Sequence, residues 1–128
     1  METPGLKSII QAYHGDLHVH SRRSDGSKEP LELLGEAKAK GMSFLALADH
    51  QRRPCQSQMV DGVFLLAAAE FSLGNRWHIL AVGAVPPEPF PSPQETPEWA
   101  DEFHRMGGVL ILAHPWTISR NRTAVRQI

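Results

Sequence analysis

The chain has 128 residues, a length typical of one domain but short for a closed (β/α) barrel, which needs about 250 residues. Its residues are 41% hydrophobic and 21% charged, and the formal net charge of -1 gives no general electrostatic reason to expect binding to nucleic acid or to an anionic membrane. No run approaches the roughly 20 apolar residues of a membrane span, and the N-terminal residues show no signal peptide. The single cysteine, Cys55, excludes an internal disulfide, so we expect a globular protein of the cytoplasm, with its oligomeric state left open.

Five short apolar runs predict strands. The first, residues 13–20, alternates polar and apolar side chains, which places His18 and His20 on the same face. The other four are nearly continuously hydrophobic, as strands of a parallel sheet buried on both faces are. These four runs cover residues 43–49, 62–69, 78–84 and 108–114.

Two helices are predicted among these strands. Residues 30–41 have an apolar stripe, begin with a proline and end with a glycine, and residues 96–108 begin with Thr96 as an N-cap and end with two glycines. Six prolines in residues 85–97 predict an extended surface loop before the second helix. The order of the elements predicts an α/β fold with about five strands, fewer than a closed barrel has.

The two histidines of the first strand can bind one cation, because side chains at positions i and i+2 of a strand share a face. The alternative is that both imidazoles face water, and the pair alone does not decide between them. Polar residues at the ends of the later strands favour the cation, because charged groups there are costly unless they are paired or bound to metal, and the strand ends of a parallel sheet lie at one edge. A tight reversal of the chain would also bring His78, at the start of its strand, beside Glu70. A glutamate that bridges two cations and is flanked by histidines is typical of two-metal hydrolytic sites. The residues concerned are His18, His20, His50, Glu70, His78 and His114.

The loop after the first strand supplies further candidates. Asp25 precedes a glycine, as turn residues often do, and a turn can also present its carboxylate to a metal. Arg22 and Arg23 can grip a phosphate bidentately, or at least one of them can remain solvated. Asp49 can orient the adjacent His50.

Four segments in this order, GDLHVHSRRSDG, LALADH, AAAEF with WHIL, and LILAHP, resemble the first four motifs of the PHP superfamily (polymerase and histidinol phosphatase). The resemblance covers residues 13–115, so we interpret residues 1–12 as an N-terminal extension and residues 116–128 as a C-terminal tail. It implies a distorted (β/α)7 barrel, incomplete in this chain. It also implies a metal-dependent phosphoesterase that hydrolyses a phosphoric ester with a metal-activated hydroxide at a multinuclear site.

The resemblance further implies a set of ligands for up to three divalent ions, which are Zn, Mn or Fe in this family. His18 and His20 would hold the first ion, and Glu70 would bridge it to the second. His78 and His114 would complete the second ion. Asp25 and His50 would hold the third.

Three residues are candidates for catalysis: Asp25, Glu70 and Arg22. The resemblance makes a small phosphorylated molecule the expected substrate. Nucleic acid is a weaker alternative, because the domain also occurs in bacterial DNA polymerases while the charge of this chain is balanced.

The chain departs from the family pattern after Pro115, where the final Asp-x-His motif is missing from the remaining 13 residues. By resemblance, the first and third ions therefore each lack one ligand, whereas the second keeps its protein ligands. Three explanations fit: the chain is a piece of a longer protein, which we favour; a second chain supplies the ligands; or the chain is a compact variant. Such a variant would be a catalytically impaired metal-binding or accessory module.

Overall fold

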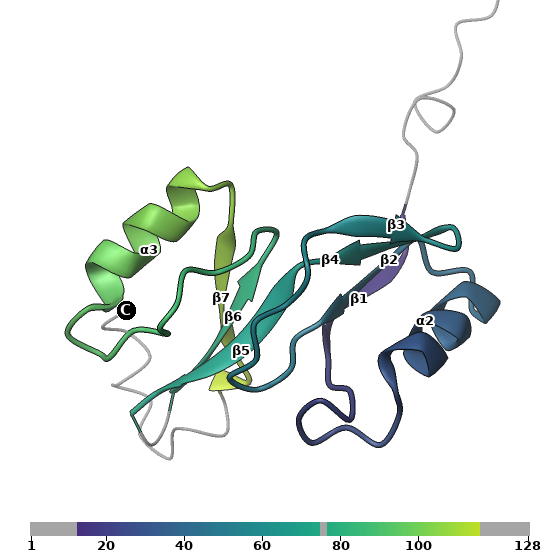
Figure 1. The fold of residues 1–128 in the computed structure, drawn as a ribbon, viewed down its shortest axis with the longest axis horizontal. Helices are drawn as coiled ribbons and strands as arrows, with labels where there is room; N and C mark the ends of the chain where they lie inside the picture. The colour runs from purple at the N-terminus through teal and green to yellow at the C-terminus, as the bar shows by residue number, and fades with distance from the viewer. Residues whose placement is uncertain (1–12, 75–76, 116–128) are drawn as a thin grey trace, which may run out of the picture.

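The computed structural model describes residues 13–74 and 77–115, and these residues form an α/β arrangement of two sheets and two helices (Figure 1). None of the described helices is long and apolar enough to cross a membrane. The strands are β1 (Gly15–Val19), β2 (Phe44–Leu47), β3 (Gln58–Val60), β4 (Val63–Leu66), β5 (Ala68–Leu73), β6 (Trp77–Val82) and β7 (Val109–Ala113), and the helices are α2 (Pro30–Ala39) and α3 (Thr96–Arg105).

The first sheet has the strand order β1-β2-β4-β3, with β1, β2 and β4 parallel and β3 antiparallel to β4. Helix α2 covers one face of it, where Leu34 and Ala37 pack against Leu45 and Val63. The helix begins with a capping box between Glu29 and its third residue, with proline at the first position, where a missing N–H costs nothing. The sequence therefore forms one parallel β–α–β unit in its first 50 residues.

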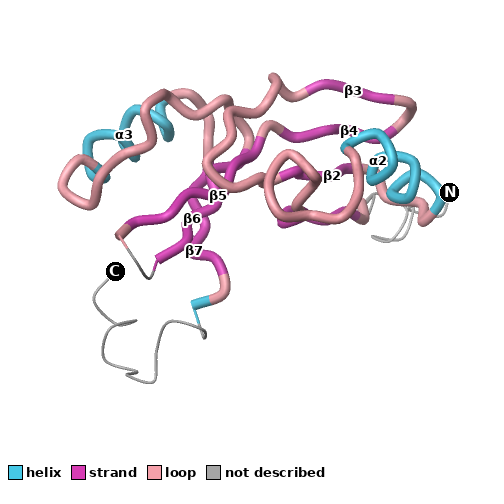
Figure 2. Tube along the Cα trace, turned by 60° about the horizontal axis from the view of Figure 1, so that its bottom comes forward, coloured by secondary structure: helices cyan, strands magenta, loops and turns pink. Residues whose placement is uncertain are grey.

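The second sheet has the order β5-β6-β7 and is antiparallel throughout. Helix α3 covers it, with Trp99 and Phe103 packed against Phe71 and Ala81. The indole N–H of Trp99 donates to the carbonyl oxygen of Pro87 at 3.0 Å, which holds the proline-rich loop against the helix. Figure 2 shows α2 and α3 at opposite ends of the molecule with the strands between them.

A third apolar cluster, rich in alanine, lies between the two sheets and joins them. Small side chains there allow the sheets to approach closely, and the backbone after β2 pairs with β5 through an isolated bridge between His50 and Glu70. The amide of Gln51 donates to the carbonyl oxygen of Glu70 at 2.8 Å. The amide of Glu70 donates to the carbonyl oxygen of Asp49 at 3.2 Å. The junction of the sheets thus carries two of the predicted site residues.

The predicted α/β class and both helices are confirmed, but the prediction of one parallel sheet is wrong for its second half. The apolar run 62–69 divides at Ala67 into β4 and β5, which belong to different sheets. The ladder is interrupted there because the amide of Ala67 donates to Ser57 Oγ instead of to a neighbouring strand. The described residues contain seven strands where about five are predicted, and their two sheets do not close into a barrel. Strand β3 at the edge of the first sheet was not predicted, because it is short and mostly exposed and so shows no alternation of apolar and polar residues in the sequence.

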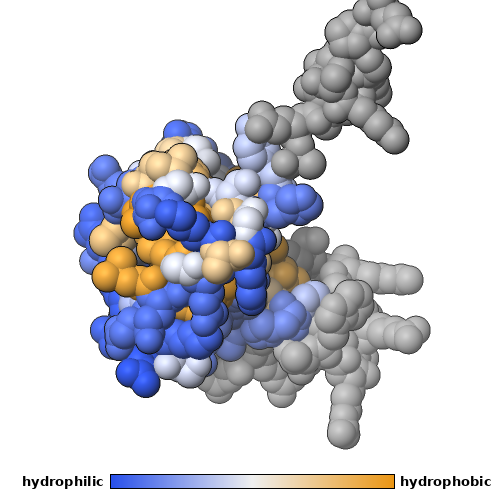
Figure 3. All heavy atoms as spheres, turned by 90° about the vertical axis from the view of Figure 1, so that its right-hand side faces the viewer, coloured by the Kyte–Doolittle hydropathy of each residue, from blue (hydrophilic) through white to orange (hydrophobic). Residues whose placement is uncertain are grey.

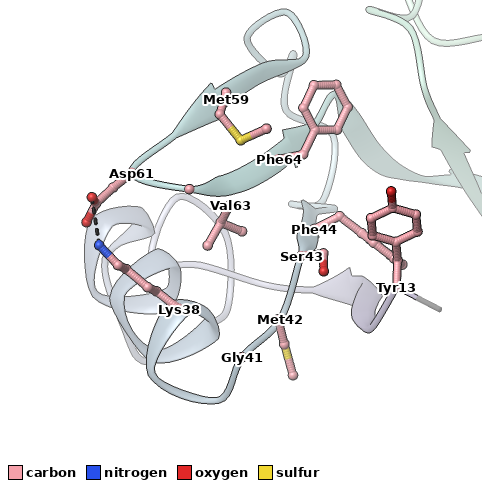
Figure 4. A pocket seen from close by; sticks show the side chains of 11 residues that line it. Tyr13, Lys38, Gly41, Met42, Ser43, Phe44, Met59, Asp61, Val63 and Phe64 are labelled. Atoms are coloured by element: carbon pink, nitrogen blue, oxygen red, sulfur yellow. Dashed lines mark hydrogen bonds and ion pairs between the residues drawn. The ribbon is translucent and has the colours of Figure 1, made fainter. Parts of the chain in front are cut away.

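An apolar hollow of about 570 Å³ lies at the start of the parallel strands, the end of the sheet opposite to His18 and His50 (Figure 4). Tyr13, Phe44, Met59 and Phe64 line it, and the ion pair between Lys38 and Asp61 at 2.8 Å stands at its margin. Figure 3 shows apolar side chains gathered on the side of the molecule that carries α2 and the β3–β4 turn, with polar residues around them.

Candidate metal centre

A buried carboxylate organises the candidate site. Glu70 lies within β5 and is 0% exposed, although an unpaired buried charge is costly. Its Oε2 atom is 3.0 Å from His18 Nε2 and 2.9 Å from His20 Nε2. Its Oε1 atom is 3.0 Å from both His78 Nδ1 and His114 Nε2. Each oxygen of one carboxylate therefore faces a different pair of imidazoles.

The antiparallel second sheet explains why His78 belongs to this cluster although it lies at the start of a strand. Strand β6 returns alongside β5 with His78 opposite Ser72, two residues beyond Glu70. On its other side His78 is opposite Ala113, and His114 follows as the next residue. The predicted reversal of the chain is confirmed, and it places His78 Nδ1 3.1 Å from His114 Nε2.

The predicted site residues form overlapping groups that together make the histidine–glutamate cluster. The first group is His18, His20 and Glu70, and the third is His20, Asp25 and His50. The second is Glu70, His78 and His114, whose donor atoms are 3.0 to 3.1 Å apart. His50 also lies close enough to Glu70 and His78 to share a cation with them, with its Nδ1 3.5 Å from Glu70 Oε2. In the third group His50 Nε2 is 3.2 Å from Asp25 Oδ2, and His20 Nδ1 is 3.6 Å from Asp25 Oδ1.

The spacing of the donor atoms fits cations better than it fits hydrogen bonds. In the first group the His18 and His20 Nε2 atoms are 3.0 Å apart, so three ligand atoms form a triangle with edges of 2.9 to 3.0 Å. A neutral imidazole has one N–H and one lone pair, so hydrogen bonds cannot satisfy all three edges at once. A cation about 2.1 Å from each ligand places ligands at right angles about 3.0 Å apart. Among the described residues, the buried Nδ1 of His20 also has no hydrogen-bond partner.

The loop that carries Asp25 is fixed by a second buried carboxylate, Asp49. It is 3% exposed and accepts hydrogen bonds from Ser21 N, Ser21 Oγ and Ser24 Oγ, each at 2.7 Å. The interpretation that Asp49 orients His50 is therefore wrong, because its carboxylate oxygens are committed to the loop. Gly26 closes the same loop so tightly that a Cβ there would collide with the carbonyl oxygen of His20. Sequence reasoning missed both serines, which carry no signal beyond their position between His20 and Asp25.

One residue next to the cluster and one residue within it have left-handed backbone angles that residues other than glycine rarely adopt. The φ angle is +50° at Gln51, which follows His50, and +30° at His114. The side-chain oxygen of Gln51 accepts a hydrogen bond from the amide of Ser72 at 3.0 Å, which fixes this turn. Such strain persists where the surrounding structure imposes it, and it often marks functional sites.

Arg22, the third catalytic candidate, is not brought into contact with the histidines by any described interaction. Its Nε donates to the carbonyl oxygen of Ser27 at 2.9 Å, and its Nη1 is 3.7 Å from Glu29 Oε1. Asp16, on the first strand, accepts a hydrogen bond from the backbone amide of His18 at 2.9 Å. Both side chains therefore support the local backbone around the cluster.

The pKa shifts of Glu70, His20 and Asp25 favour the protonation states that bind metals. Burial raises the pKa of Glu70, but hydrogen bonds from His18 and His114 outweigh it and hold the pKa below its ordinary value. Burial lowers the pKa of His20 below its ordinary value, against the opposing effect of the Glu70 charge. Desolvation raises the pKa of Asp25, yet the charges of His50 and His20 together with hydrogen bonds leave it lowered. An ionised carboxylate and a neutral imidazole are the forms that coordinate a cation.

The stability of the metal-free protein is expected to fall as the pH falls. The folded-state pKa of His20 lies below 6.5, so below that value the unfolded chain binds more protons. The same holds for Glu70 below 4.5. Urea midpoints of the chelator-treated protein should therefore decrease from about pH 7.5 to about pH 3.5. A midpoint that rises over this interval would contradict the protonation states described for the cluster.

Comparisons with known proteins found similar sequences and a similar structure. A sequence profile of the PHP domain matches residues 16–112. The chain is 34% identical over 85 residues, 58% of its length, to a 3',5'-nucleoside bisphosphate phosphatase of Chromobacterium violaceum, of which it covers 29%. It is 54% identical over 35 residues, 27% of its length, to a 5'-3' exoribonuclease of Haemophilus influenzae, of which it covers 13%. A solved structure of an amidohydrolase from Chromobacterium violaceum, with bound sulfate and no metal, is similar with a TM-score of 0.47 and 28% identity, over 72% of this chain and 32% of that chain.

Proposed function

Because the chain belongs to the PHP domain family, we propose that its histidine–glutamate cluster holds divalent cations and hydrolyses phosphoric esters. One observation carries the proposal: the two oxygens of the buried Glu70 each face two imidazole nitrogens at 2.9 to 3.0 Å. A carboxylate in this arrangement can bridge two cations, with His18 and His20 holding one, and His78 and His114 the other. Asp25 and His50 are proposed as ligands of a third cation.

The donor set suits Zn, Mn or Fe, because imidazole and carboxylate ligands bind all three. Bound divalent ions would supply Lewis acidity, which lowers the pKa of water and neutralises charge on a phosphate. The protein contributes the imidazoles of the cluster and the buried carboxylate of Glu70 to hold them. Asp49 holds the loop of residues 21–25 in place through Ser21 and Ser24, which keeps Asp25 within 3.2 Å of His50.

A small phosphorylated molecule is the proposed substrate. Similarity to a 3',5'-nucleoside bisphosphate phosphatase supports a nucleotide that carries more than one phosphate. Similarity to a 5'-3' exoribonuclease supports a nucleic acid strand as the alternative. Arg22 is proposed to bind the substrate phosphate, since its guanidinium is exposed and its ion pair with Glu29 is long, at 3.7 Å.

The chain spans less than a third of the length of the two curated relatives, so the complete activity is part of the proposal. We propose residues 13–115 as the PHP-like domain, with the two sheets as part of an incomplete distorted barrel. Residues 1–12 and 116–128, predicted as an extension and a tail, lie outside the described residues. The exposed thiol of Cys55 supports a reducing compartment such as the cytoplasm.

The second candidate function is a catalytically impaired metal-binding or accessory module. The observation that favours it is the size of the first and second groups, which offer three protein ligands each. Three ligands suffice to retain a cation, and they leave the remaining positions to solvent or to other protein groups.

Metal reconstitution followed by a phosphatase assay separates these functions. The purified chain should retain about two Mn²⁺ or Zn²⁺ ions per molecule, as a site bridged by Glu70 requires. It should also hydrolyse 4-nitrophenyl phosphate, with loss of turnover on chelation and recovery on adding metal back. Absence of turnover, with metal bound or with none, would favour the accessory module and contradict the phosphoesterase function.

A further inference from the structure

Four arginines border the third group of the cluster on two exposed loops. One pair separates His20 from Asp25 in the sequence, and the other pair begins two residues after His50. All four are exposed, and we name them the arginine rim: Arg22, Arg23, Arg52 and Arg53. Because Asp25 and His50 are in contact at 3.2 Å, the two loops meet beside the cluster.

The two loops are interlocked by the arginines themselves. Arg23 Nη2 donates to the carbonyl oxygen of Arg53 at 3.1 Å, and Arg52 Nε donates to the carbonyl oxygen of Arg23 at 3.0 Å. Each guanidinium thus spends one donor on fixing its position and keeps most of its five N–H groups for other partners. Each of these two guanidinium groups is therefore held against the backbone of the opposite loop.

The pairing of the rim with carboxylates is uneven. Arg22 pairs with Glu29 and Arg53 pairs with Glu88, each at 3.7 Å. Among the described residues, the ion pairs include neither Arg23 nor Arg52. The two arginines that fix the loops are therefore also the two whose charge no described carboxylate neutralises.

Space for a ligand exists beside the rim. An open hollow of about 630 Å³ is lined by Gln51, Glu88, Pro89 and Phe90. It adjoins the rim at both sides, because Gln51 precedes Arg52 and Glu88 pairs with Arg53. The organic part of a phosphorylated molecule can occupy it while a phosphate lies against the arginines.

We propose that Arg23 and Arg52 form a second anion subsite, which binds a phosphate next to the one that is hydrolysed at the cluster. The inference rests on the proposed phosphoesterase function and narrows it to substrates with at least two phosphate groups. Arg is suited to this role because its planar fork matches phosphate oxygens bidentately. The subsite accepts either a terminal phosphate or a phosphodiester, since both present two such oxygens.

Binding measured without turnover tests the subsite. Calorimetric titration in chelator compares adenosine 3',5'-bisphosphate, the phosphodiester-containing dinucleotide pApA and adenosine 5'-monophosphate. The double variant Arg23→Gln/Arg52→Gln should bind the first or second probe at least about tenfold more weakly than the wild type, and the monophosphate less than about twofold more weakly. A larger loss of affinity for the bisphosphate would identify a terminal phosphate as the preferred ligand of the subsite. A larger loss of affinity for pApA would identify a phosphodiester. Arg105→Gln on α3, an exposed arginine far along the chain, is the matched control and should change nothing.

Two further measurements keep the test decisive. Raising salt from about 50 mM to about 500 mM should weaken binding of the bisphosphate by the wild type more than binding of the monophosphate. This comparison needs no variant and holds even if the double variant unfolds. If the double variant lost affinity equally for all three probes, or lost affinity for none of them, the proposed subsite would be refuted. An absence of hydrolysis by the wild type would count against the phosphoesterase function alone, because binding in chelator does not depend on it.

Discussion

Glu70→Gln is expected to remove the metal-dependent activity and most of the stabilisation that metal confers. Glutamine keeps the shape of the side chain but removes the charge shared by four imidazole nitrogens at 2.9 to 3.0 Å. Loss of a bridging ligand should lower turnover by at least about a thousandfold, the effect of several kcal/mol of charge stabilisation. In thermal unfolding, Mn²⁺ or Zn²⁺ should raise the midpoint of the wild type by much more than that of the variant, which keeps only the third group intact, because a ligand stabilises the state that binds it.

The matched control is Glu102→Gln, which makes the same chemical change on the exposed side of α3. This variant should keep the activity of the wild type, and added metal should raise its thermal unfolding midpoint as much as that of the wild type. If Glu70→Gln responded to metal as strongly as the control, the role of Glu70 as the bridge would be refuted, although other ligands could still bind ions.

Asp49→Ala is expected to destabilise the protein by about 3 kcal/mol, the cost of leaving several buried hydrogen-bonding groups unsatisfied. The carboxylate is 3% exposed and accepts three hydrogen bonds at 2.7 Å, and alanine leaves Ser21, which is 0% exposed, without these partners. The loop then no longer holds Asp25 beside His50. Urea unfolding measures the stability. Metal titration should show that the third group loses its affinity for a cation while the first two groups still bind.

Asp101→Ala serves as the control for this prediction, because Asp101 lies exposed on α3. Its effect should stay within about 0.5 kcal/mol, as expected for a surface position. A destabilisation by Asp49→Ala as small as that of the control would show that the loop is held by other contacts.

The candidate site could be predicted largely because its chemistry is local in the sequence. His18 and His20 share a strand face, and His50 and His114 follow apolar runs directly. The place of His78 followed from the few residues between it and Glu70, which force the chain to reverse. The structure brings all of these side chains together, and their roles as ligands stay predictions.

The sheet arrangement could not be predicted from the same patterns. A continuous apolar run predicts a buried strand but not the sheet to which it belongs, and the run divides at Ala67, whose backbone amide donates to Ser57 Oγ. Hydrophobicity also does not distinguish parallel from antiparallel neighbours, so β5, β6 and β7 were not recognisable as an antiparallel sheet. Glu70 consequently lies within β5 and not at a strand end.

Proximity in the sequence was misleading at Asp49. It is adjacent to His50, yet its carboxylate binds Ser21 and Ser24, which precede it by more than 20 residues. Only the parallel pairing of β1 with β2 brings the ends of these strands together. Such tertiary hydrogen bonds leave no mark in a single sequence.

Anomalous X-ray diffraction from crystals grown with Mn²⁺ or Zn²⁺ tests the central claim most directly. The account predicts two anomalous peaks on either side of Glu70, one within bonding distance of His18 and His20 and the other within bonding distance of His78 and His114. Both peaks should touch the Glu70 carboxylate, one at each oxygen. Crystals with metal in excess that show no peak at Glu70, while its side chain bonds only to the surrounding imidazoles, would contradict the account.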